Sequence, residues 1–298
     1  MSTPAEKYIG RFAPSPTGPL HFGSLLAAMA SYLDARASGG TWLVRMEDLD
    51  PPREPPGTAD LILRQLEAFG LEWDGEILYQ SRRLYAYEEA LAELTNQNLC
   101  FVCDCSRARI KSMGNIYGGF CRESQKPFEN GLAVRVKVQS QTLCLDDLVQ
   151  GSYVHDLESE TGDFVILRKD GLFAYQLAVV ADDAFQEITH VIRGYDLMNS
   201  TPRQYYLQQL LQKPHPQYGH VPVIVNDKGQ KLSKQHYADS VDADSAGEQI
   251  WQVLDALNQN PPDDLLQANP AVLLQWGIEH WDIQAVPKLA NINQASLL

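Results

Sequence analysis

The sequence contains no run of eighteen or more apolar residues, so it offers no segment long enough for a transmembrane helix. Its first residues, MSTPAEKYIGRF, lack the apolar core and cleavage pattern of a secretory signal. We therefore expect a cytoplasmic protein with no membrane partner. Five cysteines among 298 residues do not make a disulfide framework. Four of them fall between Cys100 and Cys121, which favours a metal site over disulfides.

Basic residues are also scarce. Lysine and arginine together number 24, against 38 aspartates and glutamates, and the formal net charge is −14. This balance argues against general nucleic-acid binding. The charge is uneven, because residues 235–298 hold nine acidic residues and one basic residue, whereas residues 103–137 hold seven basic and three acidic residues. The second segment could form a local basic surface that meets a phosphate backbone.

The chain is long enough for more than one domain, and its first fifty residues have the pattern of a parallel α/β fold. We expect a strand at residues 8–12, a loop rich in proline and glycine at 13–19, a helix at 23–36 and a second strand at 41–46. A strand, a helix and a strand in this order make a βαβ unit, the seed of a parallel sheet.

The rest of the chain continues this pattern with one interruption. We expect helices at residues 58–69, 85–96 and 202–212, strands at 172–180 and 187–192, and a helix-rich acidic region after Asp239. Residues 100–171 look like an insertion of shorter strands and loops. The predicted division has residues 1–99 and 172–238 as the two halves of an α/β catalytic domain, residues 100–171 as an inserted subdomain, and residues 239–298 as a helical C-terminal region.

The first chemical motif is RFAPSPTGPLHFGS, from Arg11 to Ser24. A loop rich in proline and glycine leads here from a strand into a helix, whose first backbone N–H groups are free to bind a phosphate. His21 lies at that entrance and can donate to a phosphate whose charge develops during a reaction. Gly23 has no side chain, so an adenine or ribose can approach the backbone closely. The last four residues by themselves would more often be an ordinary strand-to-helix turn.

The second motif is KLSKQ, residues 231–235, which follows a glycine turn at Gly229. Lys231 and Lys234 lie three positions apart. Their ammonium groups on flexible stems suit a pyrophosphate leaving group. Taken alone, such a run is usually a solvated turn.

Together and in this order, the two motifs resemble the signature sequences of class I aminoacyl-tRNA synthetases, in the form found in glutamyl- and glutaminyl-tRNA synthetases. Ser24, Leu232 and Gln235 depart from the family's usual residues. The resemblance covers about residues 8–239 and implies a class I Rossmann-type fold, a ligase activity, and ATP as substrate together with Mg²⁺. The residues that it implies for ATP and catalysis are His21, Gly23, Ser24, Lys231, Ser233 and Lys234.

The second substrate implied by the resemblance is L-glutamate, which carries two carboxylates and one ammonium group. A pocket for it needs guanidinium groups for the carboxylates and a carboxylate for the ammonium. Residues 181–204 resemble the glutamyl-tRNA synthetases almost residue by residue. The resemblance implies Arg11 and Arg193 for the carboxylates and Glu47 for the ammonium. The full glutamate-binding set that it implies is Arg11, Ala13, Ser15, Glu47, Tyr175 and Arg193.

Thiols gather inside the predicted insertion. Three thiols and one further donor fit tetrahedral zinc, although by spacing alone inert buried thiols are an equal alternative. Spacing leaves the fourth ligand open among Cys100, Asp104 and Tyr117. The family resemblance favours Tyr117, and so implies one Zn²⁺ per chain held by Cys103, Cys105, Tyr117 and Cys121. We expect Cys144 in the core.

Only 64 residues follow Lys234. A segment this short cannot hold the long helical anticodon-binding region of glutamyl-tRNA synthetases that discriminate among tRNAs. The truncated, zinc-bearing form looks like the branch of the family that transfers glutamate to the queuosine base in the anticodon of tRNA(Asp). The resemblance thus implies the anticodon stem-loop of tRNA(Asp) as partner, and we expect a monomer. Candidates for contacts with its phosphates are Arg107, Arg109, Lys111 and Arg122; a solvated charged face is an equal alternative.

Three other functions stay open on the sequence alone. The chain could be a truncated glutamyl-tRNA synthetase that charges a tRNA 3′ end, and a charging assay would separate the two activities. It could be a catalytically dead paralogue that only binds tRNA, but both signature motifs are intact. It could be a small-molecule nucleotidyltransferase of the same superfold, but Arg11, Arg193 and Glu47 argue for an amino acid.

Overall fold

The structure is a computed structural model that describes residues 7–112, 114, 116–124, 126–230 and 240–297. Its helices are α1 Phe22–Ala37, α2 Thr58–Ala68, α3 Leu84–Asn96, α4 Arg107–Ser112, α5 Tyr175–Phe185, α6 Thr201–Leu210, α7 Ala246–Ala256 and α8 Pro270–His280. Its strands are β1 Ile9–Phe12, β2 Thr41–Met46, β3 Leu78–Tyr79, β4 Cys100–Cys103, β5 Ala133–Val136, β6 Thr142–Asp147, β7 Gly151–Asp156, β8 Val165–Leu167, β9 His190–Gly194, β10 Gln217–Val221, β11 Val223–Val225 and β12 Asn291–Asn293.

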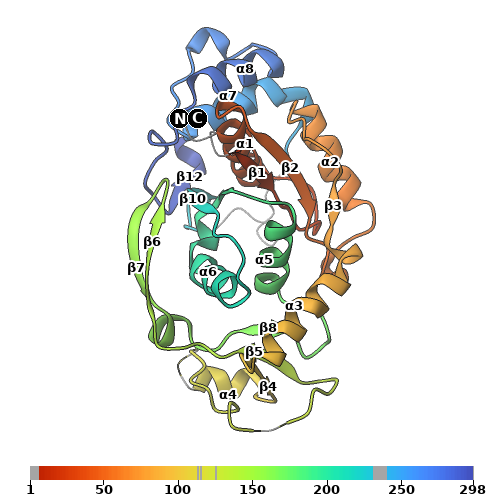
Figure 1. Ribbon diagram of the computed structural model, residues 1–298. Coiled ribbons are helices and arrows are strands. Elements are labelled where there is room, and N and C mark those ends of the chain that lie inside the picture. The colour runs from red at the N-terminus through yellow and green to blue at the C-terminus, as the bar shows by residue number, and fades with distance from the viewer. Residues whose placement is uncertain (1–6, 113, 115, 125, 231–239, 298) are drawn as a thin grey trace, which may run out of the picture.

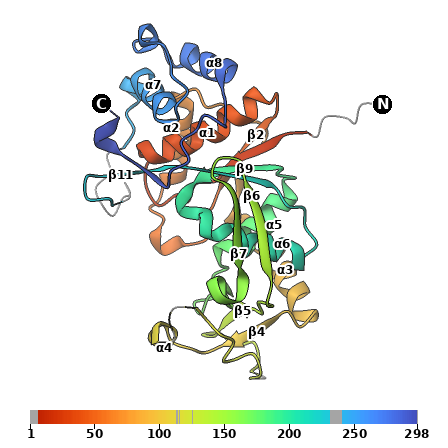
Figure 2. The same ribbon diagram turned by 90° about the vertical axis from the view of Figure 1, so that its left-hand side faces the viewer.

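The molecule is elongated in both views (Figures 1 and 2). The elements α1, α7 and α8 lie at one end, and β4, β5 and α4 lie at the other. None of the helices that the structure describes is long and apolar enough to cross a membrane.

The first part of the chain forms the expected βαβ unit. Strands β1, β2 and β3 make a parallel sheet, in which Ile9 lies opposite Thr41. Helix α1 begins after the proline- and glycine-rich loop because His21 caps it, accepting a hydrogen bond from the N–H of Ser24. It ends at Ala37, and two residues later Gly39 takes a φ of +63° that other residues rarely adopt.

A second sheet has the strand order β7-β6-β10-β9. Strand β10 is parallel to β9 and to β6, whereas β6 and β7 form an antiparallel hairpin. Strand β9 lies beside β1. The N–H of Thr189, the residue before β9, donates to the Ile9 carbonyl at 2.9 Å. Helices α5 and α6 pack on each other. The prediction of an α/β fold with parallel strands is confirmed.

The strand predicted at residues 172–180 is wrong. Phe173 is extended and bridges Leu167 at the end of β8, but helix α5 begins two residues later at Tyr175. The run from Leu177 to Val180 is buried on every side. A short run of this kind shows no polar face, so its pattern does not distinguish a buried helix from a buried strand.

Residues 100–171 contain the expected short strands and loops, together with the short helix α4, which was not predicted. Strands β4, β5 and β8 make a small antiparallel sheet, and the β6–β7 hairpin extends from the second sheet. Exposed and buried residues alternate along β6, and Cys144 falls on the exposed face opposite Val154. The prediction that Cys144 lies in the core is therefore wrong.

The C-terminal region is helix-rich, as expected, and packs on the first βαβ unit. Helices α7 and α8 contact each other and both contact α1. Strand β12 pairs with β11 in parallel, with Ile292 opposite Ile224. The division of the chain into four segments stays a prediction.

Candidate active site and metal centre

A cavity of about 640 Å³ opens where β1, β2 and β9 end. In an open α/β sheet, the carboxyl ends of the parallel strands are the usual place for a ligand. Twelve residues were predicted to bind ATP or glutamate, and the structure brings nine of them to the cavity wall: Arg11, Ala13, Ser15, His21, Gly23, Ser24, Glu47, Tyr175 and Arg193. The other three, Lys231, Ser233 and Lys234, lie outside the described residues.

The start of α1 forms one part of the cavity wall. His21 Nδ1 accepts from the Ser24 N–H at 3.2 Å, and the Ser24 hydroxyl lies 3.0 Å from His21 Nε2. A Cβ atom at position 23 would lie 3.3 Å from His21 Nδ1, so a side chain there would crowd the histidine. The positive end of the dipole of this 16-residue helix faces the cavity, which suits a phosphate group.

Glu47 supplies a carboxylate to the cavity while it is itself only 8% exposed. Burial raises the pKa of Glu47 to about 7, against the opposing attraction of Arg45 and Arg11. Arg45 lies 3.4 Å from Glu47 and 2.7 Å from Asp183, and Arg11 Nε donates to Asp183 at 3.3 Å. Although burial opposes it, the two arginines hold the pKa of Asp183 below its usual range. Asp183 therefore fixes two buried cations beside Glu47.

Arg45 and Asp183 belong to this network but were not predicted from the sequence. Arg45 carries a weak signal, because it stands two residues before Glu47 near the end of a strand, where alternate side chains share a face. Asp183 has no local signal, since 172 positions separate it from Arg11.

Arg193 is the second cation at the cavity and is 4% exposed. Tyr175, which also lines the cavity, accepts from its Nη1 at 3.3 Å. Burial raises the pKa of Tyr175, so its hydroxyl stays neutral and can donate to a substrate. The other acceptors for the guanidinium group are His220, Gln204, Thr201 and the Leu197 carbonyl. No role for His220 or Thr201 followed from the sequence, because strand β10 and helix α6 bring them to Arg193 only in the fold.

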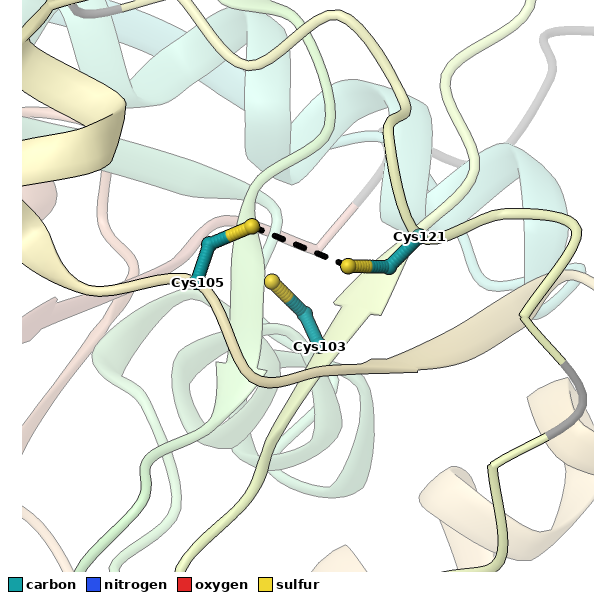
Figure 3. A group of neighbouring side chains, drawn as sticks. All are labelled: Cys103, Cys105 and Cys121. Carbon is teal, nitrogen blue, oxygen red and sulfur yellow. Dashed lines mark hydrogen bonds between the residues drawn. The ribbon is translucent and has the colours of Figure 1, made fainter.

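The three predicted cysteine ligands lie together within residues 100–171. The sulfur atoms of Cys103, Cys105 and Cys121 all lie within 4.8 Å of one another, and all three residues are buried (Figure 3). The sulfurs of Cys105 and Cys121 are 3.7 Å apart. Tetrahedral zinc with Zn–S bonds of about 2.3 Å requires sulfurs about 3.8 Å apart, so this spacing fits a zinc ion.

Tyr117 is placed as a fourth ligand would be. Its hydroxyl lies 3.5 Å from Cys103 Sγ and 3.6 Å from Cys105 Sγ, close to the ~3.5 Å expected between an oxygen and a sulfur on one tetrahedral zinc. Cys100 contacts Thr95 instead, since it stands three positions before Cys103 on a strand and faces the other side. Asp104 pairs with Lys126 and also accepts from Cys121 Sγ at 3.5 Å, but it is not part of the group of ligand atoms that all lie within 4.8 Å of one another.

The basic residues near the thiols divide into two groups. Arg107, Arg109 and Lys111 lie on the exposed helix α4. Arg122 instead makes an ion pair of 2.5 Å with the buried Asp163 and also donates to the Val138 carbonyl. Arg122 therefore links two parts of this segment, and its role as a phosphate contact stays a prediction.

The chain is similar in sequence to known proteins. A family model described as "tRNA synthetases class I (E and Q), catalytic domain" matches residues 8–254. A "Glutamyl-Q tRNA(Asp) synthetase" of Ectopseudomonas mendocina is 52% identical over 290 residues, covering 97% of this chain and 98% of the relative. A protein of the same name from Neisseria meningitidis is 52% identical over 292 residues, covering 95% and 98%.

A solved structure agrees in fold. The glutamate–tRNA synthetase of Elizabethkingia anophelis superimposes with a TM-score of 0.80 at 23% identity, covering 98% of this chain and 69% of that one. At this identity the likeness speaks for the fold alone.

Proposed function

The chain belongs to the class I tRNA synthetase family for glutamate and glutamine, and from this premise we propose that it activates L-glutamate with ATP and transfers it to the queuosine base in the anticodon of tRNA(Asp). One observation carries the proposal. A single cavity combines a helix N-terminus that suits a phosphate, two buried arginines for two carboxylates, and a carboxylate for an ammonium group. Relatives about half identical over nearly their whole length bear the name of this activity.

In the first step, an α-carboxylate oxygen of glutamate attacks the α-phosphorus of ATP. The new O–P bond gives glutamyl-adenylate, the bond to the β-phosphate breaks, and pyrophosphate leaves. His21 and the start of α1 hold the phosphate, while Gly23 and Ser24 border the nucleotide. Lys231, Ser233 and Lys234 are proposed to hold the pyrophosphate, and Mg²⁺ accompanies ATP as a countercharge. Holding both reactants in one cavity can lower the barrier by up to roughly 7–11 kcal/mol.

The amino acid is proposed to lie between Arg11, Arg193 and Glu47, with Ala13, Ser15 and Tyr175 completing its pocket. In the second step, a hydroxyl of the cyclopentenediol of queuosine attacks the carbonyl of the adenylate. An ester forms, AMP leaves and the hydroxyl proton is released. The exposed basic helix α4 supports a role for the inserted segment in gripping the anticodon stem-loop.

We also propose that Cys103, Cys105, Cys121 and Tyr117 hold one structural Zn²⁺. Three thiols and a phenol oxygen at tetrahedral spacing support it. The ion would fix the loops that carry α4. A monomer in the cytoplasm, where tRNA is present, belongs to the same proposal.

The deciding experiment compares three acceptors with radioactive glutamate and ATP. They are tRNA(Asp) with queuosine, the same tRNA trimmed of its 3′-terminal adenosine, and tRNA(Asp) with guanosine at the wobble position. We expect equal labelling of the first two and none of the third. If labelling required the terminal adenosine and was equal with queuosine and with guanosine at the wobble position, the chain would instead be a synthetase that charges a tRNA 3′ end.

A further inference from the structure

Arg193 is held on one side by three short hydrogen bonds. Its Nε donates to His220 Nε2 at 3.0 Å, Nη1 donates to Gln204 Oε1 at 2.8 Å, and Nη2 donates to Thr201 Oγ1 at 2.8 Å. Each acceptor residue is at most 2% exposed. The cavity lining, so far as the structure describes it, includes Arg193 but none of these three acceptors. They fix the plane of the guanidinium group from behind.

The two remaining N–H groups make long contacts on the cavity side. Nη1 reaches the Tyr175 hydroxyl at 3.3 Å, and Nη2 reaches the Leu197 carbonyl at 3.4 Å. Both Tyr175 and Leu197 line the cavity. Each terminal nitrogen therefore keeps one weakly engaged N–H where a substrate would lie. A pair of N–H groups on the two terminal nitrogens is the fork with which arginine binds a carboxylate.

His220 is itself fixed from behind by Asp147. Its Nδ1 lies 2.5 Å from Asp147 Oδ2, and its backbone N–H donates to Asp147 Oδ1 at 3.1 Å. The N–H groups of Val149 and Gln150 donate to the same oxygen. Because the carboxylate accepts, Nδ1 carries the imidazole proton, and Nε2 keeps the lone pair that accepts from Arg193.

We propose that His220, anchored by Asp147, is a positioning residue that orients Arg193 for a carboxylate of the amino-acid substrate. The inference rests on the proposed function, because it places glutamate in the cavity. An arginine that lost its Nε acceptor could turn about its last side-chain bonds. The fork would then be misaligned, which weakens binding of the amino acid and leaves binding of ATP unchanged.

Two substitutions at His220 test the roles of its two ring nitrogens separately. In H220N the amide reaches the place of Nδ1, so it can still donate to Asp147 but offers Arg193 no acceptor. In H220Q the amide oxygen reaches the place of Nε2, so it can still accept from Arg193 but loses Asp147. H220F keeps a ring without either nitrogen and is a second acceptor-free variant in case H220N does not fold. The control H215N changes a histidine that stacks on Tyr205, away from the cavity.

The measurement is pyrophosphate exchange with glutamate and ATP titrated separately, together with the melting temperature. We expect the KM for glutamate to rise about tenfold or more in H220N and H220F and to stay within about threefold of wild type in H220Q and H215N. The KM for ATP should not change in any variant. The inference about His220 would be overturned, with the proposed function left standing, by either of two results. One is a KM for glutamate that rises in step with the loss of melting temperature across all variants, and the other is a KM for glutamate that is unchanged in H220N and H220F. A wild-type chain without glutamate-dependent exchange would overturn the proposed function together with it.

Discussion

Glu47 lines the cavity and has a carboxyl pKa raised by burial to about 7, so its charge changes near neutral pH. Its pKa of about 7 means that the carboxyl takes up a proton near neutrality, although Arg45 and Arg11 stand close by. A neutral carboxyl attracts an ammonium group far less than a carboxylate does. If Glu47 holds the ammonium of the substrate, acidification should therefore weaken binding of the amino acid.

We predict that the KM for glutamate in pyrophosphate exchange rises as pH falls through about 7, while the KM for ATP changes little. The variant E47Q keeps the size of the side chain but has no charge to lose. It should show a KM for glutamate that is roughly tenfold or more above wild type at pH 8 and nearly constant down to pH 6. If the KM for glutamate of E47Q changed with pH in the same way as that of wild type, the titrating group would be a residue other than Glu47.

Arg193 should decide between glutamate and glutamine. Glutamine lacks the second carboxylate, so it would leave a buried guanidinium N–H unpaired, which costs about 1–3 kcal/mol. Wild type should therefore activate glutamine at least roughly ten to a hundred times less well than glutamate. Aspartate is one methylene shorter and should also be poor.

In R193A, exchange with glutamate should be lost and the gap between glutamate and glutamine should narrow. R64A is the matched control, because Arg64 is an exposed arginine of α2. Exchange rates with the three amino acids measure the effect. Unchanged glutamate kinetics in R193A would show that Arg193 has only a structural role.

The cavity residues differ in how far the sequence predicted them. Those within the motif from Arg11 to Ser24 follow one another in the chain, so a local pattern carries them. Asp183 and His220 reach the site through other elements, and a buried aspartate or histidine has no local pattern of its own. The sequence therefore predicted the residues at the cavity surface better than those that hold them in place.

At the scale of an element, the thiol cluster joins β4 to the loop that contains Tyr117. We predict about one zinc per purified chain and its loss in C121S, because three ligands rarely retain a structural zinc. C144S is the control, since Cys144 is exposed on the β6–β7 hairpin and stands outside the cluster. Elemental analysis after purification without chelator measures both.

The zinc prediction has a functional counterpart. The three cysteines lie within residues 100–171 and do not line the cavity, so C121S should reduce transfer to tRNA more than pyrophosphate exchange. Equal loss of both activities would show that the metal supports the whole fold. Metal-free wild-type protein would refute the site.

Helix α5 shows where pattern alone fails at this scale. The predicted element type agrees with the structure when a helix has one polar face. Helix α2 is an example, because Ile62 and Leu66 are buried and Arg64 and Glu67 are exposed. Between Leu177 and Val180 every residue is buried, so periodicity carries no information about the element. Cys144 is the converse case, because a small apolar residue on an exposed strand face has no distinguishing pattern.

At the scale of the whole molecule, the acidic C-terminal region is part of the core. Its helix α7 buries Ile250, Val253 and Leu254 in the same cluster as Leu33 of α1. Leu254 and Leu33 both lie 3.1 Å from where a Cβ of Gly277 would stand, so three helices meet at this glycine. The Trp281 indole also donates to Asp34 of α1 at 2.8 Å. The sequence indicated only acidic helices here, because their charges face solvent and contacts with α1 join residues more than 200 positions apart.

This packing predicts that the C-terminal helices unfold together with the first βαβ unit, which forms part of the cavity wall. L254A removes a fully buried side chain at the junction and should lower the free energy of unfolding by about 2–5 kcal/mol. L289A, at a residue 54% exposed in the same region, should cost less than about 0.5 kcal/mol. Urea titrations followed by circular dichroism and by pyrophosphate exchange measure both. In L254A the two midpoints should fall together, because α1 carries the phosphate-binding end of the cavity. A fall in the circular-dichroism midpoint with an unchanged inactivation midpoint would mean that the C-terminal region folds as a separate unit.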